Sequence, residues 1–221
     1  MDKTGFIALN YQMPEDDEVS NQSYNFYQRM QTRRSVRHFS DKEVPDKVIK
    51  NIIMTASSAP SGAHKQPWTY CVIRDQKIKT KIREAAEKEE YENYHGRMSD
   101  EWLKDLEKFE TDWHKEFLTM APCLIVIFRK AYEVDKDGLK SKNYYVNESV
   151  GISAGLLIAA IHTAGLVTLT HTPSPMNFLQ EILQRPENEK PFLLLPVGFP
   201  AANAVVPKLI RKTPEEVMIW Y

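Results

Sequence analysis

The sequence predicts an α+β or α/β sandwich in which helices pack around one sheet. Four short apolar runs, rich in β-branched and aromatic residues, are typical of internal strands. Segments in which apolar residues recur at helical spacing lie between these runs. A chain of 221 residues can bury one substantial core, so we expect residues 1–221 to form a single domain.

The first helix is predicted at residues 46–57, where apolar residues keep helical spacing until Pro60-Ser61-Gly62 interrupts the pattern. The predicted strands are bounded by proline or by charged residues, and they cover residues 69–74, 123–128, 167–172 and 192–197. A long helix at residues 146–164 carries small residues such as Gly151 and Gly155. Because small residues permit close approach, we expect a central core or interface helix.

Two segments lie outside this predicted sandwich. Residues 77–116 form a polar, charge-dense insertion with recurring large apolar residues, which predicts two amphipathic helices. The tail after Pro207 ends in Ile219, Trp220 and Tyr221. Such an apolar tail either folds back on its own subunit or is exchanged between subunits, and the residues alone leave both open.

The composition argues against nucleic acid and membrane partners. The 29 Lys and Arg residues and the 30 Asp and Glu residues give a net charge of -1, which leaves no basic excess. The longest apolar run, residues 150–161, is too short to span a bilayer, and no signal-peptide pattern opens the chain. Cys71 and Cys123 lie in apolar runs and indicate buried thiols. We expect a soluble, cytoplasmic protein without a bound metal.

A basic cluster formed by Arg33, Arg34 and Arg37 is a candidate phosphate site. Guanidinium groups bind a phosphate dianion through bidentate, charge-assisted hydrogen bonds, and Ser35 can add a hydroxyl donor. A second polar loop at residues 60–68 is suited to face the ring of a cofactor. The cluster alone is equally compatible with a solvated basic surface.

Four motifs occur together in this chain: residues 33–37 (RRSVR), residues 60–64 (PSGAH), residues 167–172 and the turn at residues 196–200 (PVGFP). In this combination the chain resembles the nitroreductase superfamily of FMN enzymes, over nearly everything after Ser23. Further segments make it similar to the iodotyrosine deiodinase family within that superfamily. These are Pro67-Trp68, Glu90-Tyr91-Glu92-Asn93-Tyr94 and Trp113-His114-Lys115-Glu116.

The resemblance implies an α+β fold with a mostly antiparallel central sheet flanked by helices. Residues 77–116 would form a helical lid, and the C-terminal tail would be exchanged in a homodimer with FMN at the subunit interface. The residues that resemblance assigns to FMN are Arg33, Arg34, Ser35, Val36, Arg37, Pro60, Ser61, Gly62, Thr170, His171, Thr172 and Arg211. Position 171 departs from the family, which usually has a threonine there.

The resemblance also implies reductive dehalogenation of 3-iodotyrosine and 3,5-diiodotyrosine to tyrosine and iodide, by stepwise electron transfer. Two residues would act at the reacting groups. Ala63 would present its backbone N–H to the substrate phenolate, and the Thr172 hydroxyl would donate near flavin N5. An electron-donating reductase would be a partner.

Three residues of the insertion suit a zwitterionic amino acid. Glu90 can bind its ammonium group, while Tyr94 and Lys115 can bind its carboxylate. Glu90 and Tyr94 are four residues apart, so on a helix they share a face. Without the resemblance, the same residues are typical of a solvated, charged helix surface.

Two other functions remain open. An NAD(P)H-dependent nitroreductase or flavin reductase would share the FMN residues but would have no use for Glu90, Tyr94 and Lys115 together. A flavin-binding or amino-acid-binding module without catalysis would bind halotyrosine but release no iodide.

Overall fold

In the computed structural model the described residues, 5–221, divide into two compact units. The first unit ends at Arg33 and contains helix α1 (Asp16–Gln31), which buries none of its side chains. The second unit begins at Arg34 and contains the sheet. A single domain over residues 1–221 stays a prediction.

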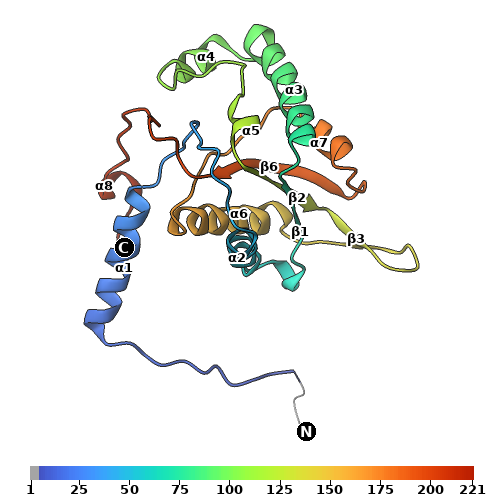
Figure 1. The fold of residues 1–221 in the computed structure, drawn as a ribbon. Coiled ribbons are helices and arrows are strands. Elements are labelled where there is room, and N and C mark those ends of the chain that lie inside the picture. The colour runs from blue at the N-terminus through green and yellow to red at the C-terminus, as the bar shows by residue number, and fades with distance from the viewer. Residues whose placement is uncertain (1–4) are drawn as a thin grey trace. The chain divides into compact units, whose positions relative to one another are not determined.

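The central sheet of the second unit has four strands in the order β1-β2-β6-β5, and each neighbouring pair is antiparallel (Figure 1). The strands are β1 (Trp68–Ile73), β2 (Cys123–Lys130), β5 (Val167–Thr168) and β6 (Glu189–Gly198). A separate hairpin pairs β3 (Tyr132–Val134) with β4 (Lys140–Lys142). This sheet confirms the α+β class and the antiparallel arrangement.

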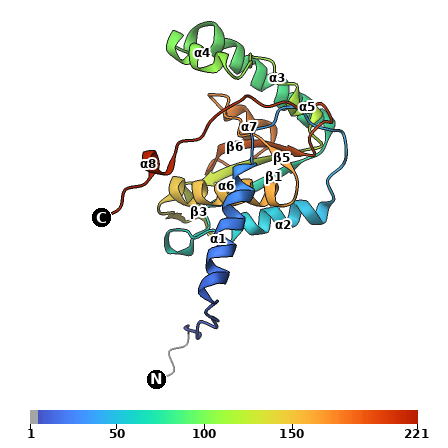
Figure 2. The ribbon, with the colours of Figure 1, turned by 90° about the vertical axis from the view of Figure 1, so that its left-hand side faces the viewer.

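Helices cover both faces of this sheet (Figures 1 and 2). On one face lie α2 (Asp46–Ser57) and α6 (Val146–Thr163), and on the other lie α3 (Gln76–Glu92), α5 (Phe117–Met120) and α7 (Asn177–Ile182). Along β2, Ile125 and Ile127 pack against α2 and α6, whereas Leu124 and Val126 pack into the opposite cluster. Strand side chains alternate between faces, so one strand supplies both cores.

The helix α6 is the core helix that the small residues predict. Its buried side chains, among them Val150, Leu157 and Ile161, pack with α2 and the sheet. Of the described helices, this one is long and apolar enough to cross a membrane by length and composition alone, and these contacts are those of a core helix. Part of its surface remains open, because Ile152 is 49% exposed.

The prediction of a strand at residues 167–172 is wrong for most of these residues. The strand β5 has only 2 residues, and beyond it a single isolated bridge joins His171 to Leu194. The pairing register of β5 with β6 continues to the bridge between His171 and Leu194, and it places Leu169 opposite Pro196. Because proline has no backbone N–H, this pair lacks a ladder donor and the strand stops.

The insertion predicted as two amphipathic helices contains α3 and α4 (Asp100–Glu107), joined by the π-helical turn η2 (Asn93–Arg97). Asp75 begins α3 by accepting a hydrogen bond from the Ile78 backbone N–H at 2.9 Å. Ser99 begins α4 in the same way through the Trp102 N–H, at 3.3 Å. Figure 1 shows α4 standing away from the sheet.

The C-terminal tail leaves the body of the second unit after β6 (Figure 2). It contains the short helix α8 (Pro214–Val217), which buries no side chain. Ile219 is 76% exposed and Trp220 is 83% exposed. These last apolar residues are therefore largely uncovered in the single chain.

Candidate functional site

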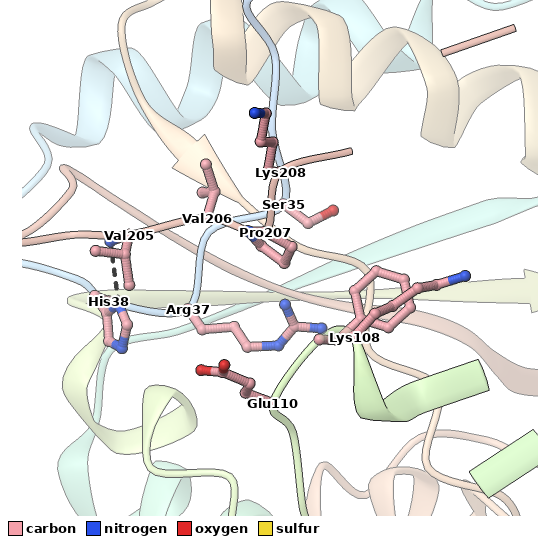
Figure 3. Close-up of a pocket in the computed structure, with 10 residues that line it drawn as sticks. Ser35, Arg37, His38, Lys108, Glu110, Val205, Val206, Pro207 and Lys208 are labelled. Atoms are coloured by element: carbon pink, nitrogen blue, oxygen red, sulfur yellow. Dashed lines mark hydrogen bonds between the residues drawn. The ribbon is translucent and has the colours of Figure 1, made fainter. Parts of the chain in front are cut away.

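A cavity of about 440 Å³ opens in the second unit beside the basic cluster (Figure 3). It is lined by Ser35, Arg37, His38, Lys108, Phe109, Glu110, Val205, Val206, Pro207 and Lys208. Arg37, Lys108 and Lys208 give its wall an excess of positive charge over the single carboxylate of Glu110. Such a lining suits an anionic ligand with polar groups.

Backbone pairing holds the cluster segment at this cavity. The Val36 N–H donates to the Thr168 carbonyl at 3.1 Å, next to the parallel bridge between Ser35 and Thr168. Val36 is buried, and because side chains alternate along extended backbone, its neighbours Ser35 and Arg37 project from the opposite side. Burial lowers the pKa of Arg37, although a guanidinium stays charged at neutral pH.

The other arginines assigned to FMN occupy different positions. The guanidinium of Arg34 donates to the carbonyl of Pro207, which ties the cluster to the segment after β6. Arg211 is exposed on the C-terminal tail and does not line the cavity. Arg33 belongs to the first unit. The roles of these arginines stay predictions.

The loop at residues 60–64 packs at the start of α6. A Cβ added to Gly62 would lie 2.8 Å from the Tyr144 carbonyl oxygen, so only glycine fits there without a shift. Ala63 adopts a left-handed conformation with φ 51, which is uncommon for a residue with a side chain. Its N–H donates to no other group that the structure describes between residues 5 and 221. A strained residue with a free donor suits ligand binding.

This loop and the basic cluster lie toward opposite ends of α6. The loop contacts Tyr144 and Ser149 at the start of the helix, whereas Ser35 pairs with Thr168 beyond its end. A helix of 18 residues is about 27 Å long. None of residues 60–64 lines the cavity beside Arg37. One chain therefore does not bring the two predicted FMN motifs together.

Thr170, His171 and Thr172 alternate in burial, because the backbone after β5 remains extended. Thr170 and Thr172 are exposed, whereas His171 is 7% exposed and points to the opposite side. Its ring packs edge-on against Phe117, with centroids 5.5 Å apart. The residue that departs from the family pattern thus faces the protein interior.

Burial, together with the positive charges of Lys115 and Arg37, lowers the pKa of His171 to about 3. An unfolded histidine titrates near about 6.5, so below that pH the unfolded chain takes up a proton that the folded chain does not. We expect this difference to reduce the free energy of unfolding by about 2 kcal/mol between about pH 6.5 and about pH 5. His171→Gln should remove this part of the dependence of the free energy of unfolding on pH. Urea unfolding of both proteins across this range tests the expectation, and equal slopes would contradict it.

The structure brings Glu90, Tyr94 and Lys115 together, although they come from α3, η2 and the segment before α5. The Lys115 ammonium lies 3.4 Å from a Glu90 carboxylate oxygen, and their side chains are 4% and 9% exposed. The same ammonium lies 5.3 Å from the centre of the Tyr94 ring. This is a buried, oppositely charged pair beside the Tyr94 ring.

The electrostatics connect these insertion residues to the basic cluster. Burial lowers the pKa of Lys115, with Glu90 opposing the shift and Arg37 adding to it. Burial also raises the pKa of Tyr94, whose hydroxyl remains a donor and bonds to the Thr111 carbonyl at 3.2 Å. Arg37, Tyr94 and Lys115 are therefore close enough to affect one another's charge.

Sequence reasoning missed the two lysines that line the cavity, Lys108 and Lys208. Lys108 stands in a loop among other charges and Lys208 stands between Pro207 and Leu209, and no spacing or motif distinguishes either from a solvated lysine.

Two other types of site gain no support from the structure. Among the residues it describes, no group of three or more His, Cys, Asp or Glu side chains is placed to hold a metal ion. Cys71 and Cys123 are free thiols, and burial raises the pKa of Cys123 to about 11. A thiol with such a pKa is a poor nucleophile.

Comparison with known proteins identifies the family. The chain matches the Nitroreductase family over residues 30–199. It is 63% identical over 219 residues to the iodotyrosine deiodinase of Haliscomenobacter hydrossis, covering 99% of each chain. It is 45% identical over 214 residues to human iodotyrosine deiodinase 1, covering 96% of this chain and 74% of the human protein.

The fold agrees with solved structures. An oxidized iodotyrosine deiodinase bound to FMN and 3-iodo-L-tyrosine superposes with a TM-score of 0.76 at 28% identity, covering 89% of this chain and 98% of that one. A Bacteroides fragilis nitroreductase with bound FMN shares the fold, with a TM-score of 0.64 at 17% identity over 88% of this chain and 98% of its own. The chain belongs to the nitroreductase family and, within it, to the iodotyrosine deiodinases.

Proposed function

We propose that this protein is an FMN-dependent iodotyrosine deiodinase, which converts 3-iodotyrosine and 3,5-diiodotyrosine to tyrosine and iodide. The observation that carries the proposal is the buried pair of Glu90 and Lys115 beside the half-buried Tyr94, close to the charge of Arg37. An ordinary nitroreductase has no need for a zwitterion site. Membership of the iodotyrosine deiodinases supports the same substrate.

The cavity beside Arg37 fits the anionic part of FMN. Ser35 and Arg37 offer donors that match a phosphate or the polar edge of a flavin ring, and Lys108 and Lys208 add positive charge. FMN, when bound, supplies the electrons for reductive loss of iodide. The protein's own residues bind the substrate, orient it and exclude water.

Substrate binding replaces one ion pair by two. In this structure the Lys115 ammonium pairs with Glu90 and also donates to the Asp112 carbonyl. The ammonium group of halotyrosine takes the place of Lys115 at Glu90, and its carboxylate binds Lys115 and the Tyr94 hydroxyl. Because Glu90 and Lys115 are buried, their charges act with little screening by water. A phenol without the zwitterion cannot make this exchange.

Two further residues serve the reacting ring. Ala63, whose N–H has no partner within the described chain, donates to the phenolate oxygen of the substrate. Thr172 is exposed on the side opposite His171, so its hydroxyl would be available as a donor to the ring of bound FMN. Such a donor would favour the stepwise electron transfer proposed for the reaction.

The enzyme works as a homodimer with FMN at the subunit interface. The separation of the loop at residues 60–64 from the basic cluster supports this arrangement, since a second chain can bring its loop to the first chain's cluster. The exposed Ile219 and Trp220 support exchange of the tail. Electrons come from a separate reductase in the cytoplasm, so NAD(P)H alone should not reduce the bound FMN.

One preparation tests the proposal. We expect the purified protein to be yellow, to release iodide when the dithionite-reduced form is mixed with 3-iodotyrosine, and to sediment at roughly twice its 25.6 kDa chain mass. Turnover of nitroaromatics without any iodide release would favour a nitroreductase. Tight binding of 3-iodotyrosine without iodide release would indicate a non-catalytic module.

A further inference from the structure

Glu87 makes a contact that links α3 to the backbone of Lys115. One of its carboxylate oxygens accepts a hydrogen bond from the Lys115 backbone N–H at 2.7 Å. The same oxygen accepts from the Nε of Arg83, also at 2.7 Å. The Glu87 side chain is only 16% exposed, so both are charge-assisted bonds with limited competition from water.

Lys115 is therefore held at two points by one face of α3. Glu87 and Glu90 are three residues apart, which places them on neighbouring turns of the same face. Glu87 binds the backbone of Lys115, while Glu90 lies 3.4 Å from its ammonium group. The backbone contact does not involve the charge that the substrate carboxylate needs. The hydrogen bond from the Lys115 N–H to Glu87 can therefore persist when the substrate replaces the ion pair between Lys115 and Glu90.

Neighbouring contacts hold the same segment in place. Trp113, two residues before Lys115, meets the Tyr91 ring of α3 edge-on, with centroids 5.4 Å apart and an interplanar angle of 86°. Arg83 also donates to the Thr119 hydroxyl in α5 at 3.1 Å. Glu87 thus lies at the centre of a set of contacts that joins α3 to the chain on both sides of Lys115.

We propose that Glu87 is a positioning residue for substrate recognition, which keeps the backbone of Lys115 in register with α3 so that its ammonium group meets the substrate carboxylate. This inference rests on the proposed function. A lysine side chain has many rotamers, and a fixed backbone reduces the conformational entropy lost when it binds. No other described acidic side chain bonds to the Lys115 N–H.

Substitutions that keep the length of the side chain isolate the hydrogen bond between Glu87 and the Lys115 N–H. Glu87→Gln keeps an oxygen that can accept the N–H, whereas Glu87→Met keeps the length and removes the acceptor. We expect Glu87→Met to weaken 3-iodotyrosine binding about tenfold, raising KM with little change in kcat, and Glu87→Gln to stay within about threefold of wild type. The matched control is Glu84→Met, an exposed carboxylate on the same helix without a hydrogen bond or ion pair to the rest of the described chain.

Two further measurements separate positioning from a general defect. All variants should retain FMN and bind 2-iodophenol, which lacks the zwitterion, as wild type does. In a Lys115→Met background, adding Glu87→Met should cause no further loss of 3-iodotyrosine affinity, because Glu87 acts only through Lys115. If Glu87→Met proves unstable, Glu87→Ala supplies a second variant without an acceptor.

The outcomes are distinct. Additive losses in the double variant, equal weakening by Glu87→Gln and Glu87→Met, or parallel loss of 2-iodophenol binding would each overturn the positioning role. If the wild-type protein itself shows no affinity for 3-iodotyrosine, the proposed function fails instead.

Discussion

Lys115→Met should weaken 3-iodotyrosine binding by roughly ten- to a hundredfold and should also destabilise the protein by about 3 kcal/mol. The substrate carboxylate loses its cationic partner. The second effect follows because the Glu90 side chain, 9% exposed, is left buried without the ammonium group 3.4 Å away. Flavin fluorescence during titration with 3-iodotyrosine measures the first effect, and urea unfolding measures the second.

A double variant separates these two effects. Lys115→Met with Glu90→Gln leaves no buried charge alone, so most of the lost stability should return. Substrate affinity should not return, because both ends of the zwitterion then lack a charged partner. The cavity beside Arg37 is untouched, so FMN should remain bound in every variant. Unchanged affinity in Lys115→Met would exclude Lys115 from the substrate site.

Gly198→Ala should destabilise the fold by about 3 kcal/mol and weaken FMN retention. A Cβ at this position would lie 2.6 Å from Cδ of Pro122 and 3.3 Å from the Phe39 ring. A proline ring cannot rotate away, so the backbone must shift. Phe39 is two residues from Arg37 in the segment that lines the cavity. Thermal unfolding and flavin absorbance after gel filtration measure the two effects.

A second substitution tests the cause of this destabilisation. Pro122→Ala removes the atoms that a Cβ at position 198 would meet, so Gly198→Ala should cost much less stability in that background. Equal losses in both backgrounds would show that the backbone freedom of Gly198, rather than the contact with Pro122, is what matters.

Local patterns predicted the elements whose side chains follow one clear period. The helix expected at residues 46–57 matches α2, since its apolar stripe packs on a single core. The strand after α6 could not be predicted from its own residues, because it is ended by Pro196 in another strand. Predicting this required the pairing register, which is a tertiary property.

The residues of the candidate site likewise differ in whether the sequence alone could indicate them. The resemblance to the iodotyrosine deiodinases pointed to Glu90, Tyr94 and Lys115 as a group, because by themselves these residues are equally typical of a solvated helix surface, and the structure places them together. The lining by Lys108 and Lys208 depends on two distant loops meeting across the cavity. Among residues 5–221, the loop at residues 60–64 does not line the cavity beside Arg37, which no local pattern reveals.

The interruption opposite Pro196 also affects how the sheet meets other molecules. The outer edge of a sheet is a template for pairing with strands of other chains, and long flat edges promote aggregation. Here the strand at that edge has 2 residues, and Thr168 already bonds to the segment of Ser35 and Val36. The strand β5 itself therefore offers an intruding strand too few consecutive free N–H and C=O groups to pair with.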